Sequence, residues 1–485
     1  MTMWLGRVRF VAAGLVLGGL ALLPGCGGGS RPASIVLVVV DTLRADFLGS
    51  YGFGGPISPN LDRLAEDAVV FERAYAPSPW TKPSMASLFT SLYPQVHGIT
   101  NHEGSFWGGD ENEEVRIGVL SDRATTLAEA LQAEGYETAG FVTNPWLKAD
   151  YGFGQGFDLY DDSISDRYTE EIEAAPANEI ASAAISWLRG REDDRPFFLY
   201  LHLMDVHTPY ALHAERSDYD ALVGAPQVRS DVQMEESQAF HQTFYNVEQK
   251  PEWATDEMRR TVAYWRTRYA AGVRGMDHDL SEFLDHLESA GHLEDSYFVL
   301  TSDHGEELFE HGSWSHGQNL FFHQLHVPLF VRPPGGLAGG RRVPDIVELM
   351  DVMPTLMTLG GAPSIPQTQG QDLSGFLQGG TPEVRGEAFA TATQPYPMLH
   401  AMQTADHKLI MDIETRNGWL FDSIADPLEQ LNRAGTPDWE KVASQMQFQL
   451  TNHVGDSLAN GTLTSETTEI PEEMLERLRA LGYVR

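Results

Sequence analysis

Residues 35–41 read IVLVVVD, a run of aliphatic, mostly β-branched residues that ends in an aspartate. A continuous apolar run of this length predicts a strand that is buried on both faces, as strands in parallel sheets are. Similar runs lie further along the chain, at residues 138–142, 197–203, 297–301 and 327–331. Helical patterns separate them, at residues 58–65, 126–135, 180–188 and 256–289. Strands that alternate with helices indicate an α/β fold with a mainly parallel central sheet sandwiched by helices.

The chain divides into two parts by pattern. Residues 34–385 carry the strand and helix alternation, apart from residues 209–255, which are irregular and charged and predict a lid-like insertion. From residue 386 the pattern changes to short strands at 407–412 and 419–421 and a terminal helix at 472–481. We therefore expect one large domain and a small C-terminal α+β subdomain over residues 386–485.

Polar residues follow several of the predicted strands directly. Asp41, Asn144, His207 and the pair Asp303-His304 each lie just past a strand's C-terminal end, where open α/β sheets bind ligands. Carboxylate, imidazole and hydroxyl groups that converge there could hold a divalent cation, which would polarise an ester oxygen. Each residue alone also has a structural explanation, such as Asp41 capping a turn.

Residues 78–94 read SPWTKPSMASLFTSLYP and predict a turn followed by the start of a helix near Thr81. A hydroxyl at that point would face free backbone N–H groups and the positive end of the helix dipole. It is therefore a natural place for an anionic oxyester to bind. The alternative is that Thr81 only caps the helix.

Charge excludes one class of partner. The 485 residues include 33 Lys and Arg against 69 Asp and Glu, a formal net charge of −36, so nucleic acid is not an expected partner. With 42% hydrophobic residues, the chain can bury a large core.

The N-terminus has the pattern of an export signal. Arg7 and Arg9 precede an apolar run at residues 10–23 that is too short to span a membrane comfortably, and Leu23-Pro24-Gly25-Cys26 resembles the bacterial lipobox. This predicts a signal peptide over residues 1–25 and a lipid-modified Cys26 on a flexible tether, residues 26–33. We expect an exported lipoprotein, periplasmic or at the cell surface and anchored to the membrane; a plain secreted protein is the alternative. Cys26 is the only cysteine, so neither an intramolecular disulfide nor a cysteine nucleophile in the core is available.

The ordered set of motifs resembles the sulfatase family of the alkaline phosphatase superfamily over nearly the whole mature chain. The stretch Thr81-Lys82-Pro83-Ser84-Met85 with Ala86 to Pro94 is similar to the family signature. Residues 40–46 (VDTLRAD), 202–210 (HLMDVHTPY) and 302–306 (SDHGE) are similar to segments that supply metal ligands and an active-site histidine. The resemblance implies an alkaline phosphatase-like fold and an ester hydrolase.

Carried over residue by residue, the resemblance implies metal ligands at Asp41, Asp303, His304 and Thr81, with Thr81 as the nucleophile. It implies catalytic or substrate-contacting roles for His207 and His316, and substrate contacts at Asn144 and Lys82. The chain departs from the family at Thr42, where a second Asp is common, and at Met85, where the signature has Arg. His316 and Asn144 stand where Lys is typical.

Thr81 also changes the expected chemistry. Sulfatases convert a signature Cys or Ser to formylglycine, and Thr81 offers neither, so no formylglycine is expected. Threonine at this position resembles the nucleophile of phosphotransferase relatives, which favours phosphate or phosphonate esters of small molecules, glycans or lipids. The family implies one divalent cation, Ca²⁺, while the imidazole ligand is more typical of Mn²⁺ or Zn²⁺. A head-group transferase of the cell envelope and a non-catalytic binding protein remain alternatives.

Overall fold

The computed structural model describes residues 31–99, 102–103, 116–165, 175–192, 194–208, 210, 256–392, 398–459, 463 and 466–469. The expected signal peptide, Cys26, the expected helix at 472–481 and all of the expected lid except Tyr210 lie outside these residues. None of the helices in the described part combines the length and the apolar character that a membrane crossing requires.

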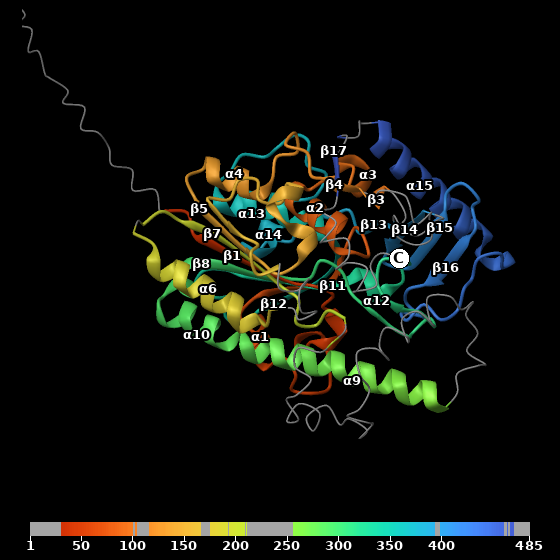
Figure 1. Ribbon diagram of the computed structural model, residues 1–485. Helices are drawn as coiled ribbons and strands as arrows, with labels where there is room; N and C mark the ends of the chain where they lie inside the picture. The colour runs from red at the N-terminus through yellow and green to blue at the C-terminus, as the bar shows by residue number, and fades with distance from the viewer. Residues whose placement is uncertain are drawn as a thin grey trace, which may run out of the picture. The chain divides into compact units, whose positions relative to one another are not determined.

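An eight-stranded sheet forms the centre of the structure (Figure 1). β1 (Ser34–Val40) lies in its middle and pairs in parallel with β7 (Phe197–Leu203) and β8 (Ser296–Thr301). The strand order is β12-β2-β11-β8-β1-β7-β5-β6, completed by β5 (Glu137–Val142), β6 (Leu159–Asp161), β11 (His326–Arg332), β2 (Val69–Tyr75) and β12 (Arg341–Glu348). Only β11 runs antiparallel to its neighbours, β8 and β2. The predicted mainly parallel sheet is confirmed.

Successive residues of β1 point to opposite faces of this sheet. Ile35, Leu37 and Val39 belong to one hydrophobic core, and Val36, Val38 and Val40 belong to another. The first core lies under α2 (Thr81–Thr90), α4 (Leu127–Ala133) and α13 (Val352–Gly360), and the second under α1 (Pro59–Ala65), α6 (Ala177–Gly190), α9 (Asp256–Asp279) and α10 (Ser281–Ser289). Figure 1 shows the two helical layers on either side of the sheet.

Several elements of the main part differ from the prediction. The helical pattern at residues 256–289 is two helices, α9 and α10, that meet at Leu280. β2, β6 and β12 are strands that the sequence did not predict. β2 has two charged residues in its middle, and β12 is an edge strand with Pro344 and a register shift between Val343 and Ile346. β12 tolerates these irregularities because it is an edge strand, and they hide it in the sequence.

The C-terminal part contains a four-stranded antiparallel sheet in the order β13-β14-β15-β16 (Glu387–Ala392, Leu399–Thr404, His407–Asp412 and Gly418–Asp422). The last two strands match the predicted ones, whereas β13, β14 and the helix α15 (Glu440–Ala459) were not predicted. The small α+β subdomain is therefore present. Short strands at Arg116–Val119, His102–Glu103 and Glu466–Glu469 make a further sheet.

Two buried carboxyl groups lie at the end of β12. Glu348 accepts hydrogen bonds from the Tyr93 hydroxyl (2.8 and 3.0 Å) and from the Phe389 N–H (2.9 Å), and Arg385 lies 3.2 Å away. Asp351 accepts from the N–H of Glu348 at 2.8 Å. Burial raises the pKa of Glu348 to about 7 and that of Asp351 to about 6. At a pH of about 6, the pair therefore binds more protons in the folded protein than in the unfolded chain.

This pair predicts a pH-dependent stability. Because the folded pKa lies above the ordinary value, the contribution of Glu348 is present below about pH 4.5 and is lost as the pH rises towards 7. Glu348→Gln should therefore gain stability relative to the unsubstituted protein between pH 5 and pH 8, on the order of 2 kcal/mol. Denaturant unfolding at both pH values measures this, with the exposed Glu288→Gln as control. A difference that does not change with pH would contradict it.

Candidate active site

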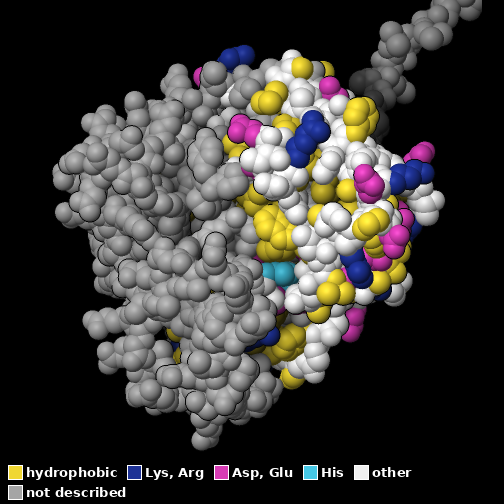
Figure 2. Space-filling view, turned by 90° about the vertical axis from the view of Figure 1, so that its right-hand side faces the viewer, with side chains coloured by type: hydrophobic (Ala, Val, Ile, Leu, Met, Phe, Trp, Pro, Cys, Tyr) yellow, Lys and Arg dark blue, Asp and Glu magenta, His cyan; other side chains and the backbone are white. Residues whose placement is uncertain are grey.

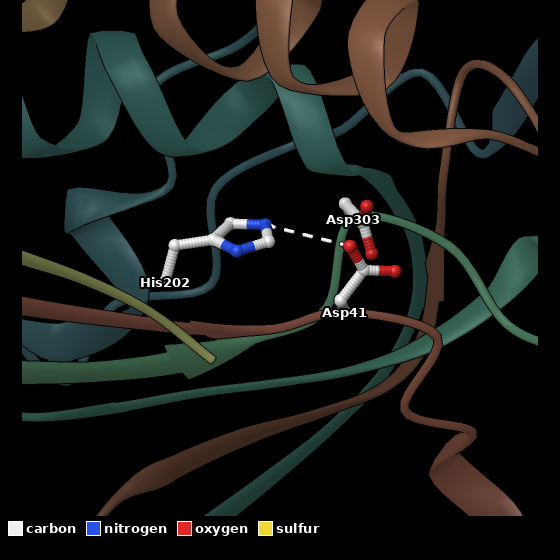
Figure 3. Close-up of side chains that lie close together, drawn as sticks. All are labelled: Asp41, His202 and Asp303. Carbon is white, nitrogen blue, oxygen red and sulfur yellow. Dashed lines mark ion pairs between the residues drawn. The ribbon is translucent and has the colours of Figure 1, made fainter. Parts of the chain in front are cut away.

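Three neighbouring strands, β7, β1 and β8, place polar side chains at or just past their C-terminal ends, in the middle of the main sheet. Val39 pairs with His202 of β7 and with Thr301 of β8, so the ends of these strands lie level. Asp41 follows β1 directly, and Asp303 lies two residues beyond β8. One ligand atom from each of Asp41, His202 and Asp303 lies within 4.8 Å of the others (Figure 3).

Each carboxylate has one oxygen that is bound and one that is not. Oδ2 of Asp41 accepts from Nδ2 of Asn144 at 2.6 Å, and Oδ1 of Asp303 accepts from the N–H groups of Thr42 (3.1 Å) and His304 (2.8 Å). Oδ1 of Asp41 and Oδ2 of Asp303 are buried and have no hydrogen-bond partner in the described part of the chain. Buried oxygens without a partner are rare, and a bound ion is one established explanation.

Two imidazoles face the same space. Nδ1 of His304 lies 2.8 Å from the carbonyl oxygen of Gly305, and because a carbonyl only accepts, Nδ1 carries the hydrogen. Nε2 of His304 is then a lone-pair donor, 3.4 Å from Oδ2 of Asp303 and 3.9 Å from Oδ1 of Asp41. His202 is fully buried, and neither ring nitrogen has a hydrogen-bond partner among the described residues; Nε2 lies 3.9 Å from Oδ2 of Asp41. Burial lowers the pKa of His202 to about 4, so it is neutral.

The two carboxyl groups cannot easily be charged together. Burial, with the charge of Asp303, raises the pKa of Asp41 well above its ordinary value. Burial acts in the same direction on Asp303, but His304, His202 and the two N–H groups outweigh it and leave its pKa lowered. A divalent cation would remove the repulsion. The unbound oxygens and the two imidazoles therefore fit a divalent cation, held by Asp41, Asp303 and His304 together with His202.

Thr81 lies beside this cluster and does not cap its helix. The N-cap of α2 is Trp80, without a side-chain cap bond, and Thr81 is the first helical residue. Oγ1 of Thr81 is 3.4 Å from Oδ2 of Asp41, to which it donates, and 3.4 Å from Nε2 of His304. The Ser84 hydroxyl donates to the carbonyl oxygen of Asp303, which attaches the helix to the end of β8.

The polar neighbours of Thr81 have fixed orientations. Oδ1 of Asn144 accepts from the N–H of Trp146 at 2.8 Å, so its amide nitrogen points to Asp41 and, at 3.5 Å, to Oγ1 of Thr81. Thr42 has a left-handed backbone (φ 60°), costly for a β-branched residue, and this turns its N–H towards Asp303. Its hydroxyl donates to the carbonyl oxygen of Asp41 at 2.7 Å.

The ring of His316 lies next to the rings of both His304 and His207. The ring centroid of His316 is 4.5 Å from that of His304 and 5.1 Å from that of His207. Nδ1 of His316 lies 3.0 Å from Oε1 of Glu306, and Nδ1 of His207 lies 2.7 Å from the carbonyl oxygen of Thr208. Burial lowers the pKa of His207 to about 3 and raises that of Glu306 to about 7.

Lys82, which was predicted to contact the substrate, points towards Tyr151. Nζ of Lys82 is 4.1 Å from the centre of the Tyr151 ring, is buried, and has no hydrogen-bond partner among the described residues; burial lowers its pKa well below the ordinary value. Met85, at the signature's arginine position, is packed in the hydrophobic core.

The sequence did not single out His202 or Glu306. His202 is the sixth residue of β7 and reads as one polar residue inside an apolar strand, while Glu306 follows the expected ligand pair at a distance of two residues. The sequence feature that could have indicated His202 as a site residue is its position as a histidine near the C-terminal end of a buried strand.

Figure 2 shows one face of the molecule. On its described part, histidine atoms are visible next to hydrophobic side chains, and charged side chains of both signs are scattered over the rest of this face.

Comparison with known proteins decides the family. The model of the family described as Sulfatase matches residues 33–362, more than half of the chain. The chain belongs to the sulfatase family. A second model, described as the C-terminal part of N-sulphoglucosamine sulphohydrolase, matches residues 310–455.

Relatives and solved structures agree with this sulfatase assignment. An N-acetylglucosamine-6-O-sulfatase of Bacteroides thetaiotaomicron is 23% identical over 86% of this chain and 85% of its own length. The phosphonate monoester hydrolase of Agrobacterium radiobacter has the same fold, with a TM-score of 0.68, 22% identity and coverage of 91% of this chain and 100% of its own. A protein in complex with its substrate D-glucosamine-2-N,6-O-disulfate matches with a TM-score of 0.69 and 20% identity, over 89% and 99% of the two chains. The alkaline phosphatase-like fold is thereby confirmed, and members of the family bind a divalent metal.

The substitution Asp41→Asn should affect the stability of the folded protein in opposite directions with and without metal. After chelation, Asp41→Asn should leave the unfolding temperature unchanged or raise it, because it removes the repulsion between two buried carboxylates. With Mn²⁺ or Zn²⁺ at about 100 times the dissociation constant, the unsubstituted protein should gain about 2.7 kcal/mol and the variant much less.

Thermal unfolding with and without metal, with exposed Asp285→Asn as the matched control, measures both effects. Equal stabilisation of the variant and the unsubstituted protein by the cation would show that the ion binds elsewhere.

Proposed function

We propose that this sulfatase-family chain is a metal-dependent hydrolase that attacks phosphoric or phosphonic esters with Thr81, and sulfuric esters more slowly. The observation that supports it is the position of the Thr81 hydroxyl: buried, at the start of α2, and within 3.5 Å of Asp41, His304 and Asn144. A hydroxyl held against a carboxylate and an imidazole is a typical activated nucleophile.

In the proposed first step, Oγ1 of Thr81 forms a bond to phosphorus as the bond to the ester's leaving oxygen breaks. The hydroxyl proton passes to Oδ2 of Asp41, to which Thr81 donates. The leaving oxygen takes a proton from Nε2 of His316, which acts in its doubly protonated form with Nδ1–H on Glu306. In the second step, water forms the new bond to phosphorus and gives one proton back to Nε2 of His316. The Thr81–phosphorus bond breaks, and Oγ1 takes back the proton held by Asp41. One water molecule is consumed for each ester cleaved.

The side chains around Thr81 divide the work. The amide of Asn144 donates towards Oγ1 and holds it in place. His207 is neutral with its hydrogen on Nδ1, so its Nε2 can accept a hydrogen bond but cannot supply a proton without first gaining one. A divalent cation at Asp41, His202, Asp303 and His304 would act as a Lewis acid on the ester oxygen and lower the pKa of a bound hydroxyl.

The donor set also favours one type of metal. Two imidazoles beside two carboxylates suit Mn²⁺ or Zn²⁺ better than Ca²⁺, which prefers oxygen ligands throughout. The cation titration described above, repeated with Ca²⁺, orders the three ions. Tighter binding of Ca²⁺ than of the other two would contradict this part of the proposal.

Threonine supports phosphorus over sulfur esters because a threonyl ester has no second hydroxyl on the same carbon to expel the sulfate or phosphate group. It must be cleared by attack of water, which phosphoryl transfer allows through an in-line displacement.

Thr81 variants test this proposal. Thr81→Ala should lower kcat on aryl phosphonate and phosphodiester substrates by at least about 10³-fold, while Thr81→Ser keeps measurable turnover. Aryl sulfate should be turned over more slowly than either phosphorus ester. The exposed Thr358→Ala on α13 serves as the matched control.

Initial rates with metal supplied are the measurement. Full activity of Thr81→Ala would exclude the nucleophile, and release of product only when an alcohol acceptor is added would indicate a transferase instead.

A further inference from the structure

A short hairpin places a glutamate against one of the active-site histidines. β9 (Glu307–Leu308) pairs with β10 (Trp314–Ser315), with Glu307 opposite Ser315. The residues just outside this pair are Glu306 and His316, so the register brings them face to face. Oε1 of Glu306 lies 3.0 Å from Nδ1 of His316. The contact follows from the pairing of backbone strands and does not depend on flexible side chains reaching across solvent.

The backbone on both sides of His316 is in the left-handed region. Ser315 has a φ of 74° and Gly317 a φ of 90°. Left-handed serine is uncommon, and such positions persist only where the surroundings impose them, often at functional sites. The N–H of Gly317 donates to Oε1 of Gln324 at 3.1 Å, which fixes the chain just after the histidine. His316 is thus held by its own backbone in one direction.

Glu306 is held just as firmly. It is fully buried, and its second oxygen, Oε2, accepts from the Tyr210 hydroxyl at 2.9 Å. Its carbonyl oxygen accepts from Nη1 of Arg44 at 3.1 Å. With one donor on each carboxylate oxygen, the plane of the carboxylate is fixed. Tyr210 lies three residues after His207, so Glu306 joins the segment that carries His207 to the hairpin that carries His316.

We propose that Glu306 is a positioning residue that fixes the ring of His316. It accepts from Nδ1–H, so Nε2 is the nitrogen presented to the substrate in every turnover. Its partner Tyr210 keeps His207 and His316 at a constant separation. This inference rests on the proposed function, in which His316 serves the leaving oxygen. A hydrogen-bonded partner on the far nitrogen is the usual device for fixing a catalytic imidazole.

A double-variant cycle separates positioning from simple structural support. Glu306→Ala should lower kcat about 10- to 100-fold with KM changed less than about threefold. The isosteric Glu306→Gln, which can still accept from Nδ1–H, should recover most of that loss. In the His316→Ala background, Glu306→Ala should cause no further loss of kcat, because it acts only through His316. Unfolding temperatures of all variants establish that they fold.

Nitrogen-15 NMR of the histidine side chains gives a readout that needs no substrate. The His316 ring should show hydrogen on Nδ1 in the unsubstituted protein and in Glu306→Gln, and a mixture of tautomers in Glu306→Ala. The matched control is Glu307→Gln, the adjacent buried glutamate, which binds the N–H of His311 and not His316, and should leave the His316 signal unchanged.

The outcomes distinguish this inference from the proposed function. An unchanged His316 signal in Glu306→Ala, or losses of kcat that multiply in the double variant, would overturn the positioning role. If the His316 tautomer depends on Glu306 but no ester is cleaved, the positioning contact stands and the proposed reaction is wrong.

Discussion

Asp41 and Asp303 end neighbouring strands and bring two carboxylates into the same buried space. Each charge would be expensive to bury alone, and their repulsion adds to that cost. Each carboxylate nevertheless keeps one oxygen free of any hydrogen bond within the described residues. Two charged carboxylates this close together are favourable in a buried space only if a positive charge lies between them. The active site is organised around this electrostatic demand.

The surrounding structure keeps the two carboxylates where they are. The parallel register of β1 and β8 sets their separation, and the strained turn at Thr42 directs its N–H at Asp303. Ser84 ties the start of α2 to the carbonyl of Asp303, so the nucleophile candidate moves with the carboxylate. The amide of Asn144 donates a hydrogen bond to Asp41 and so fixes that carboxylate in place. Strain and burial that would weaken an ordinary loop are tolerated here because both cores of the sheet support the strand ends.

Much of the fold and part of the site could be predicted from the sequence. β1, β5, β7, β8 and β11 are apolar runs, and the polar residues that follow β1 and β8 were found for that reason. β2 was missed because Glu72 and Arg73 interrupt its apolar run, and β12 was missed because its edge position allows charged residues and proline. His202 was missed because its strand looks uniformly buried, and only the pairing with Val39 shows that it lies beside Asp41. Lys82 was expected at the substrate, but which way the first turn of α2 faces depends on how the helix packs, and this directs Lys82 towards Tyr151.

The central claim is that a single cation binds between the two strand ends, within reach of Thr81. Crystals grown with Mn²⁺ or Zn²⁺ and measured at the absorption edge of the metal test it directly. We expect one anomalous peak bonded to Oδ1 of Asp41 and Oδ2 of Asp303 at about 2.0–2.2 Å, with an imidazole nitrogen as a further ligand. No peak at this position, in crystals where the two carboxylates remain side by side, would contradict it.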